Sequence, residues 1–72
     1  MISEGELLYY LFEAKGVTVE SVSEWYGTDK ENAETMLEKF FEEGFAKKEE
    51  KRRGVFYTIT DKGLKELGYY VI

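Results

Sequence analysis

Five basic residues fall within seven positions of this 72-residue chain. They stand beside two acids, Glu49 and Glu50, so residues 47–53 carry a formal charge of +3. Ammonium and guanidinium groups on one short segment are suited to binding the phosphate oxygens of nucleic acids. The alternative is a charged hairpin whose lysines keep its edge from pairing with other chains. We predict phosphate contacts from Lys47, Lys48, Lys51, Arg52 and Arg53.

The remainder of the chain is acidic, which makes this basic segment unusual. Residues 1–46 hold eleven acids and three bases, whereas residues 47–72 hold four acids and seven bases. The formal charge is therefore −8 in the first part and +3 in the second, and −5 in total. Such a sign asymmetry favours a nucleic-acid partner for the basic part.

The chain has neither histidine nor cysteine, and this excludes most catalytic and metal chemistry. The usual nucleophile–base pairs and the usual zinc and iron ligands are missing. Carboxylates are abundant, but their spacing is that of solvated helix surfaces. We therefore expect a non-enzymatic protein with no catalytic residue, no metal site and no cofactor.

Two short helices are predicted before residue 27. Ser3 and Glu6 form a capping box, Ile2 and Leu7 are placed as a hydrophobic staple, and Gly16 is expected to end the first helix as a left-handed cap. A second helix is expected over residues 19–26, ended by Gly27. Thr18 either caps it or belongs to a short strand at residues 17–19. The first helix has an apolar stripe of Leu7, Leu8, Leu11 and Phe12.

A third helix is predicted over residues 30–43, begun by a Thr28–Glu31 capping box or by Asp29 and ended by Gly44. Strands are expected at 45–50 and 55–59, joined by a turn at 51–54. A last helix is expected at about 61–67, capped by Thr60, held by Leu64 and Leu67, and ended by Gly68.

The outward face of the third helix has a mixed composition. Lys30, Asn32, Thr35 and Lys39 are candidates for contacts with base edges or phosphates. Glu31, Glu34 and Glu38 share that face and would be repelled by phosphates. Two alternatives stay open: Glu31 or Glu34 accepts a hydrogen bond from a cytosine amino group, or the glutamates only solvate the helix.

The order of these elements resembles a winged helix-turn-helix domain, and the chain is similar to small MarR-like and PadR-like regulators. Val22 and Gly27 match the second helix and its turn, and Gly44-Phe45 matches the entry to the wing. Thr28, the acidic third helix and the acidic overall charge depart from the pattern. The remaining matches are Ala33, Leu37, Phe40, Tyr57-Thr58-Ile59-Thr60 and Gly63.

This resemblance implies an α+β, mainly α fold over residues 1–72 as a single winged-helix domain. The domain would have a three-helix core, a two-stranded β wing and a short C-terminal helix. It implies a small transcriptional regulator that binds double-stranded DNA through the basic wing and the third helix. The alternative is a protein-interaction module of transcription or replication machinery that binds no DNA.

Aromatic and apolar residues near both termini exceed what a small core requires. One explanation is a homodimer, since many winged-helix regulators dimerise through terminal elements. The other is that the tail folds back over the first helix and enlarges the core. The residues of this predicted dimer interface are Tyr9, Tyr10, Tyr69, Tyr70, Val71 and Ile72.

The sequence also indicates where the protein works. No apolar run reaches the roughly 18 residues of a membrane span, and the start does not resemble a signal peptide. We therefore expect a cytoplasmic protein without a membrane partner. Thirteen of the fifteen acids are glutamate and eight of the ten bases are lysine, a composition that leans towards a thermophile.

Overall fold

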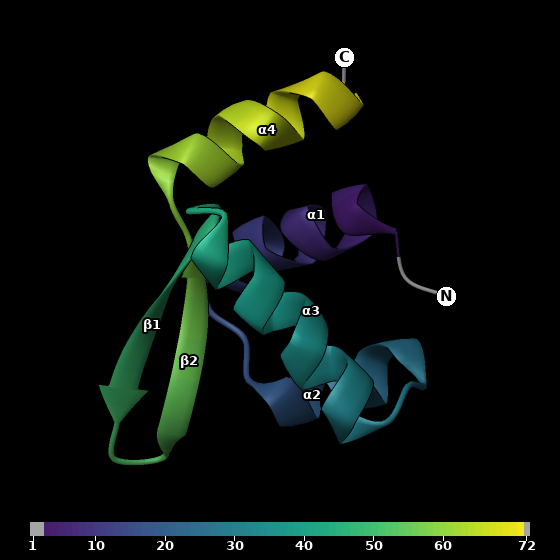
Figure 1. Ribbon diagram of the computed structural model, residues 1–72, viewed down its shortest axis with the longest axis vertical. Coiled ribbons are helices and arrows are strands. Elements are labelled where there is room, and N and C mark those ends of the chain that lie inside the picture. Colours follow the sequence, from purple (N-terminus) through teal and green to yellow (C-terminus); the bar gives the residue numbers. More distant parts are fainter. Residues whose placement is uncertain (1–2, 72) are drawn as a thin grey trace.

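The computed structural model describes the backbone of residues 3–71 and the side chains of residues 3–68. Within this range the chain forms four helices and one antiparallel hairpin, which projects from the helical body (Figure 1). The predicted α+β, mainly α architecture is confirmed. The elements are α1 (Glu4–Ala14), α2 (Val19–Tyr26), α3 (Lys30–Glu42), β1 (Ala46–Lys51), β2 (Gly54–Ile59) and α4 (Asp61–Val71).

Side-chain caps fix where the helices begin. The Ser3 hydroxyl accepts a hydrogen bond from the Glu6 amide at 3.1 Å. Thr18 and Ser21 cap α2 reciprocally, each hydroxyl accepting from the other residue's amide at 3.0 Å. Of the two caps predicted for α3, the structure shows Asp29, whose carboxylate accepts a hydrogen bond from the Asn32 amide at 2.7 Å. Each such cap stabilises its helix by about 1 kcal/mol.

The helix ends differ from the prediction in two places. Helix α1 ends at Ala14, and Lys15 rather than Gly16 is its left-handed cap, with φ of 56°. Gly68 does not end the last helix, since α4 continues to Val71. One glycine costs a helix only about 1 kcal/mol relative to alanine, which the surrounding turns can offset. The predicted end at Gly27 is confirmed, with φ of 65°.

The hairpin, which we call the wing, has a shorter turn than predicted. Ala46 pairs with Ile59 and Lys51 with Gly54, so Arg52 and Arg53 form a two-residue turn. Val17 adds one bridge on the open side of β2, exchanging hydrogen bonds with Tyr57 at 2.9 and 2.7 Å. Both possibilities for residues 17–19 therefore hold in part, with Val17 in the bridge and Thr18 as a cap.

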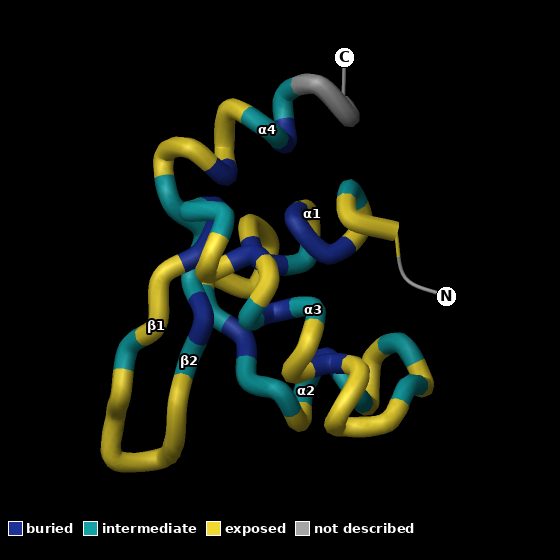
Figure 2. The backbone as a smooth tube through the Cα atoms, viewed as in Figure 1, coloured by how far each residue is buried: buried dark blue, intermediate teal, exposed yellow. Residues whose placement is uncertain are grey.

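The core lies where α1, α2, α3 and the base of the wing meet (Figure 2). The helix residues that match the winged-helix pattern, Val22, Ala33, Leu37 and Phe40, are all buried. The predicted apolar contacts of Phe12 and Leu64 are wrong, because these side chains are 49% and 40% exposed. Phe12 lies about 140° around the helix from Leu7, at the edge of the apolar stripe. The buried apolar residues are Leu7, Leu8, Leu11, Val17, Val22, Ala33, Leu37, Phe40, Phe45, Ala46, Tyr57 and Leu67.

Helix α4 is joined to the wing by a close backbone approach. The Thr60 amide donates to the Phe45 carbonyl at 3.0 Å, and the Thr60 hydroxyl donates to the Gly44 carbonyl at 2.5 Å. The Gly63 amide donates to the same hydroxyl at 3.1 Å. A Cβ on Gly63 would lie 2.3 Å from the Phe45 carbonyl oxygen. Glycine is therefore required at this position for α4 to dock.

We predict that Gly63→Ala lowers the free energy of unfolding by about 1–3 kcal/mol, because the added methyl group overlaps backbone. Gly68→Ala is the matched control, since a Cβ there meets no described atom within 4 Å. It should raise the free energy of unfolding by about 0.5–1 kcal/mol. Urea denaturation of the two variants measures both effects. Equal effects would contradict the proposed role of Gly63.

Candidate nucleic-acid interface

The turn of the wing carries the guanidinium groups of Arg52 and Arg53. Both residues are exposed, and within residues 3–68 neither makes an ion pair. They stand at the end of the hairpin that is farthest from α4 (Figure 1). Their positive charge is therefore available to a partner outside the molecule.

The solvent-facing side of β1 carries Lys47 and Lys51 beside a shared carboxylate. Glu49 lies 3.6 Å from the ammonium group of each lysine. The Lys51 ammonium group also lies 5.4 Å from the centre of the Phe56 ring on β2. The two lysines are more than half exposed, so these contacts are weakened by solvent. This side of the wing keeps a net positive charge.

Lys48 has a different environment from the other four bases of the wing. It lies opposite Tyr57 in the hairpin, and its ammonium group is 2.5 Å from the Glu38 carboxylate on α3. The same ammonium group lies 4.8 Å from the centre of the Phe41 ring. Only about a third of the Lys48 side chain is exposed, at 34%. The structure thus places Lys48 between the wing and α3.

Glu38 accepts from both strands of the wing at once. Besides the Lys48 contact, the Tyr57 hydroxyl donates a hydrogen bond to the Glu38 carboxylate. The Lys48 hydrogen bond, and then the Tyr57 hydrogen bond, hold the pKa of Glu38 below its ordinary value. Burial, and then the hydrogen bond to Glu38, raise the pKa of Tyr57. Glu38 therefore stays ionised and Tyr57 protonated at neutral pH. We call Glu38, Lys48 and Tyr57 the Glu38 cluster.

The four candidates on α3 all contact other groups of the protein. Lys30 lies 3.5 Å from Glu20, and the Asn32 amide group donates to the Thr28 hydroxyl at 3.4 Å. The Thr35 hydroxyl donates to the Glu31 backbone carbonyl at 2.9 Å. The residues remain exposed, so they can exchange these partners for others.

Lys39 is the most strongly engaged of the α3 candidates. Its ammonium group donates to the Glu4 carboxylate of α1 at 2.9 Å and lies 3.9 Å from Glu43. The hydrogen bond to Glu4 is the main cause of the raised pKa of Lys39. A phosphate would have to compete with two carboxylates for this lysine. Lys39 therefore offers less net positive charge than its residue type suggests.

A shallow surface on α3 mixes candidates and acids. It brings together three of the predicted contact residues with four glutamates, so the net charge of this surface is negative. Carboxylates on a surface that faces phosphates weaken non-specific binding. The exposed positive charge is therefore concentrated on the wing, whereas this surface of α3 presents polar and acidic groups. The residues of this surface are Lys30, Glu31, Glu34, Thr35, Glu38, Lys39 and Glu42.

Two residues of the predicted dimer interface, Tyr9 and Tyr10, have described side chains, and these lie in different environments. Tyr9 is 47% exposed on α1, whereas the Tyr10 ring stacks on Trp25 of α2 with 4.7 Å between ring centres. The side chains of Tyr69, Tyr70 and Val71, and the whole of Ile72, lie outside the described residues. The alternative in which the tail covers the first helix concerns the same side chains.

The described part of the chain also bears on metal binding and on membrane insertion. Among these residues no group of three or more Asp or Glu side chains is placed to hold a metal ion. Within the same range, none of the helices has the length and apolar character needed to cross a membrane.

Solved structures provide the comparison that bears on the fold. A mutant of MarR from E. coli superimposes with a TM-score of 0.83 at 18% identity, over 94% of this chain. The protein ST1889 from the thermoacidophilic archaeon Sulfolobus tokodaii gives a TM-score of 0.72 at 21% identity, also over 94% of this chain. The fold is a MarR-like winged helix. The predicted resemblance to this fold is confirmed.

The chain corresponds to only part of each of these two proteins. The chain spans about half of the E. coli MarR chain, at 54%, and 71% of the S. tokodaii chain. No family model and no curated protein matches the sequence. At these identities the likeness concerns the fold, and the role of each side chain has to be argued from this structure.

Sequence reasoning missed the Glu38 cluster and the Lys39–Glu4 pair. From its position in the sequence, Glu38 belongs with the acids of α3 that repel phosphates, and Lys48 belongs with the predicted phosphate contacts. One signal was present: Tyr57 alternates with Phe56 and Thr58, so its side chain had to face away from theirs. Which acid it would meet depended on how the wing packs on α3.

We predict that Glu38→Gln lowers the free energy of unfolding at pH 7, because the amide cannot hold the Lys48 charge. The folded pKa of Glu38 lies below its ordinary value of 4.5, so its stabilising effect is complete above that pH. The effect declines as the pH falls through the lower, folded pKa. Urea titrations of wild type and variant between pH 7 and pH 2 should therefore converge at the acidic end.

Glu34→Gln is the matched control for this experiment. It removes one carboxylate from the same helix at an exposed position that makes no ion pair with any described residue. Its stability should stay close to that of the wild type across the pH range. A constant difference between wild type and Glu38→Gln down to pH 2 would show that ionised Glu38 does not hold the wing.

Proposed function

We propose that this protein is a small transcriptional regulator that binds duplex DNA through the tip of its wing and the exposed face of α3. The fold supports the proposal, since the domain has the shape in which a helix and a hairpin contact one duplex together. The observation that carries it is the pair Arg52 and Arg53. These are exposed arginines without an ion pair among the described residues, in a chain of net charge −5.

The proposed binding mode follows from how the charges are distributed. Arg52 and Arg53 would contact phosphates or enter a minor groove, where guanidinium groups are favoured. Lys47 and Lys51 would add phosphate contacts along β1, since solvent-exposed pairs with Glu49 are readily exchanged. Lys48 would act indirectly by holding the wing on α3.

Helix α3 would supply selectivity more than affinity. Asn32 and Thr35 are exposed and uncharged, and amide and hydroxyl groups read base edges. The neighbouring Glu31 and Glu34 would accept hydrogen bonds from cytosine amino groups, or would repel the phosphates of a DNA duplex bound in the wrong position. Few phosphate contacts and an acidic helix imply modest affinity that falls steeply with salt.

We predict that Arg52→Gln with Arg53→Gln weakens binding to random duplex DNA by roughly tenfold or more at low salt, because two phosphate contacts are lost. The slope of log Kd against log salt concentration should fall by about 1.8, since each contact contributes about 0.9. Fluorescence anisotropy with a labelled duplex at several salt concentrations measures both quantities.

The control is Lys15→Gln with Lys65→Gln, which removes the same two charges from exposed positions outside the wing. Its affinity and salt slope should stay close to those of the wild type. If both double variants weaken binding equally, net charge rather than the wing tip determines affinity. If wild type binds no duplex at micromolar concentration and low salt, the protein-interaction alternative is favoured instead.

We further propose that two copies act together on a two-fold DNA site. Support comes from the apolar sequence of residues 69–72. A closed pair would place two wings and two α3 helices on one duplex, which raises affinity without adding contacts per copy. A cytoplasmic location and a thermophilic source stay predictions from composition.

A further inference from the structure

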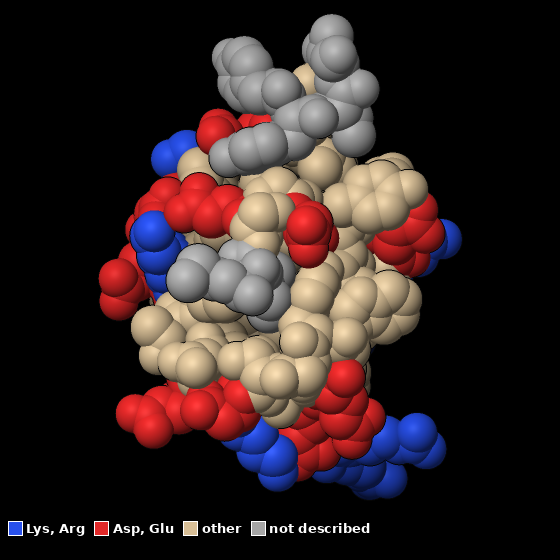
Figure 3. All heavy atoms as spheres, turned by 90° about the vertical axis from the view of Figure 1, so that its right-hand side faces the viewer, with Lys and Arg blue, Asp and Glu red and all other residues tan. Residues whose placement is uncertain are grey.

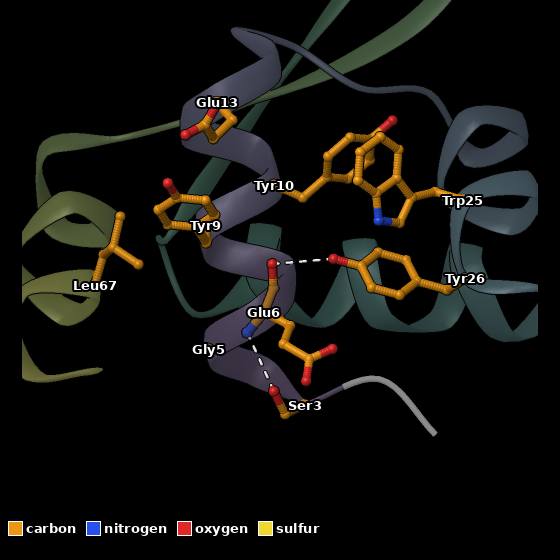
Figure 4. Close-up of a pocket in the computed structure, with 9 residues that line it drawn as sticks. All are labelled: Ser3, Gly5, Glu6, Tyr9, Tyr10, Glu13, Trp25, Tyr26 and Leu67. Atoms are coloured by element: carbon orange, nitrogen blue, oxygen red, sulfur yellow. Dashed lines mark hydrogen bonds between the residues drawn. The ribbon is translucent and has the colours of Figure 1, made fainter. Parts of the chain in front are cut away.

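A groove runs along α1 between α2 and α4, on a part of the molecule that includes neither the wing nor α3. Its volume is about 660 Å³, within the range of roughly 300–1,000 Å³ that is typical of small-molecule sites. Leu67 and Tyr9 lie on one side of α1, and Tyr10, Trp25 and Tyr26 lie on the other (Figure 4). The lining residues are Ser3, Gly5, Glu6, Tyr9, Tyr10, Glu13, Trp25, Tyr26 and Leu67.

The α2 side of the groove is an ordered group of aromatic rings. Tyr10 and Trp25 are stacked, with 4.7 Å between ring centres and 29° between ring planes. Tyr26 meets Tyr10 edge-on at 5.9 Å, and its hydroxyl donates to the Glu6 backbone carbonyl at 3.1 Å. Trp25 is nonetheless 68% exposed, the most of any large apolar side chain among the described residues. Such exposure of an ordered aromatic group is typical of a binding surface.

The charged residues that line the groove are both acids. Glu6 and Glu13 lie along α1, and no lysine or arginine is among the residues described as lining it. The Glu13 carboxylate raises the pKa of the Tyr9 hydroxyl. Burial, and then the Glu6 charge, raise the pKa of Tyr26. Glu13 thus acts on the Tyr9 ring on one side of α1, and Glu6 acts on the Tyr26 ring on the other side.

We propose that this groove binds a small aromatic organic cation. The faces of Trp25 and the tyrosines attract positive charge, and nearby carboxylates add to that attraction. The same carboxylates repel an organic anion. A second copy is a poorer occupant, because it would bring its own Glu6 and Glu13 to a surface that already holds these two acids. The view from the right-hand side of Figure 1 shows acidic groups interspersed with uncharged surface on this face of the molecule (Figure 3).

The fluorescence of Trp25 provides a direct test, since it is the single tryptophan of the chain. Tetraphenylphosphonium and tetraphenylborate serve as probes, because they have nearly the same shape and opposite charge. Titration with tetraphenylphosphonium should change the Trp25 emission saturably, and tetraphenylborate should not. Equal responses to the two ions, or no response to the cation at millimolar concentration, would overturn the proposal.

A pair of double variants tests the carboxylates. Glu6→Gln with Glu13→Gln should weaken tetraphenylphosphonium binding by roughly tenfold. Glu31→Gln with Glu34→Gln removes the same charge from α3 and should leave binding within about twofold. Equal affinities of the two double variants would overturn the proposal. So would Trp25 emission that responds to protein concentration and not to the cation, which would identify a second copy as the occupant. None of these readouts uses DNA, so the result is independent of the function proposed above.

Discussion

The carboxylate of Glu38 joins the third helix to both strands of the wing. It accepts from Lys48 on β1 and from Tyr57 on β2, and Tyr57 also exchanges backbone hydrogen bonds with Val17 ahead of α2. One tyrosine therefore connects the wing, the third helix and the segment between α1 and α2. Because these contacts are only partly exposed, they fix the direction of the hairpin more firmly than surface pairs do. The position of Arg52 and Arg53 relative to α3 depends on this link.

This arrangement changes how the charge of the chain is interpreted. A count of bases on the wing gives five, but Lys48 is paired with Glu38, and Glu49 lies between Lys47 and Lys51. On α3, Lys39 is held by Glu4 of the first helix. The positive charge left for a partner is concentrated at the turn of the wing. An acidic domain can in this way present one strongly basic end, which orients it on a polyanion.

Most of the fold could be predicted from the sequence, because local signals and tertiary packing agree. Asp29 and Gly27 set the turn between α2 and α3, and Leu37 and Phe40, which match the winged-helix pattern, lie in the core. The failures occurred where a local preference is weak. Gly68 was expected to end α4, but a single glycine costs too little to stop a helix. Phe12 follows the apolar periodicity of α1, yet its side chain is 49% exposed.

The candidate site was less predictable than the fold. Residue type identified the wing bases. Whether Lys48 contacts a phosphate or pairs within the protein depends on Glu38, which lies ten positions earlier on α3. The stacking of Tyr10 on Trp25 likewise joins two helices whose packing angle the sequence does not specify.

Amide chemical-shift mapping of the protein with a random duplex at low salt shows directly whether the wing and α3 bind DNA together. We expect the largest amide shifts at residues 51–54 and in the first half of α3, with little change in the groove along α1. Shifts confined to that groove, or none at saturating duplex, would contradict this binding mode.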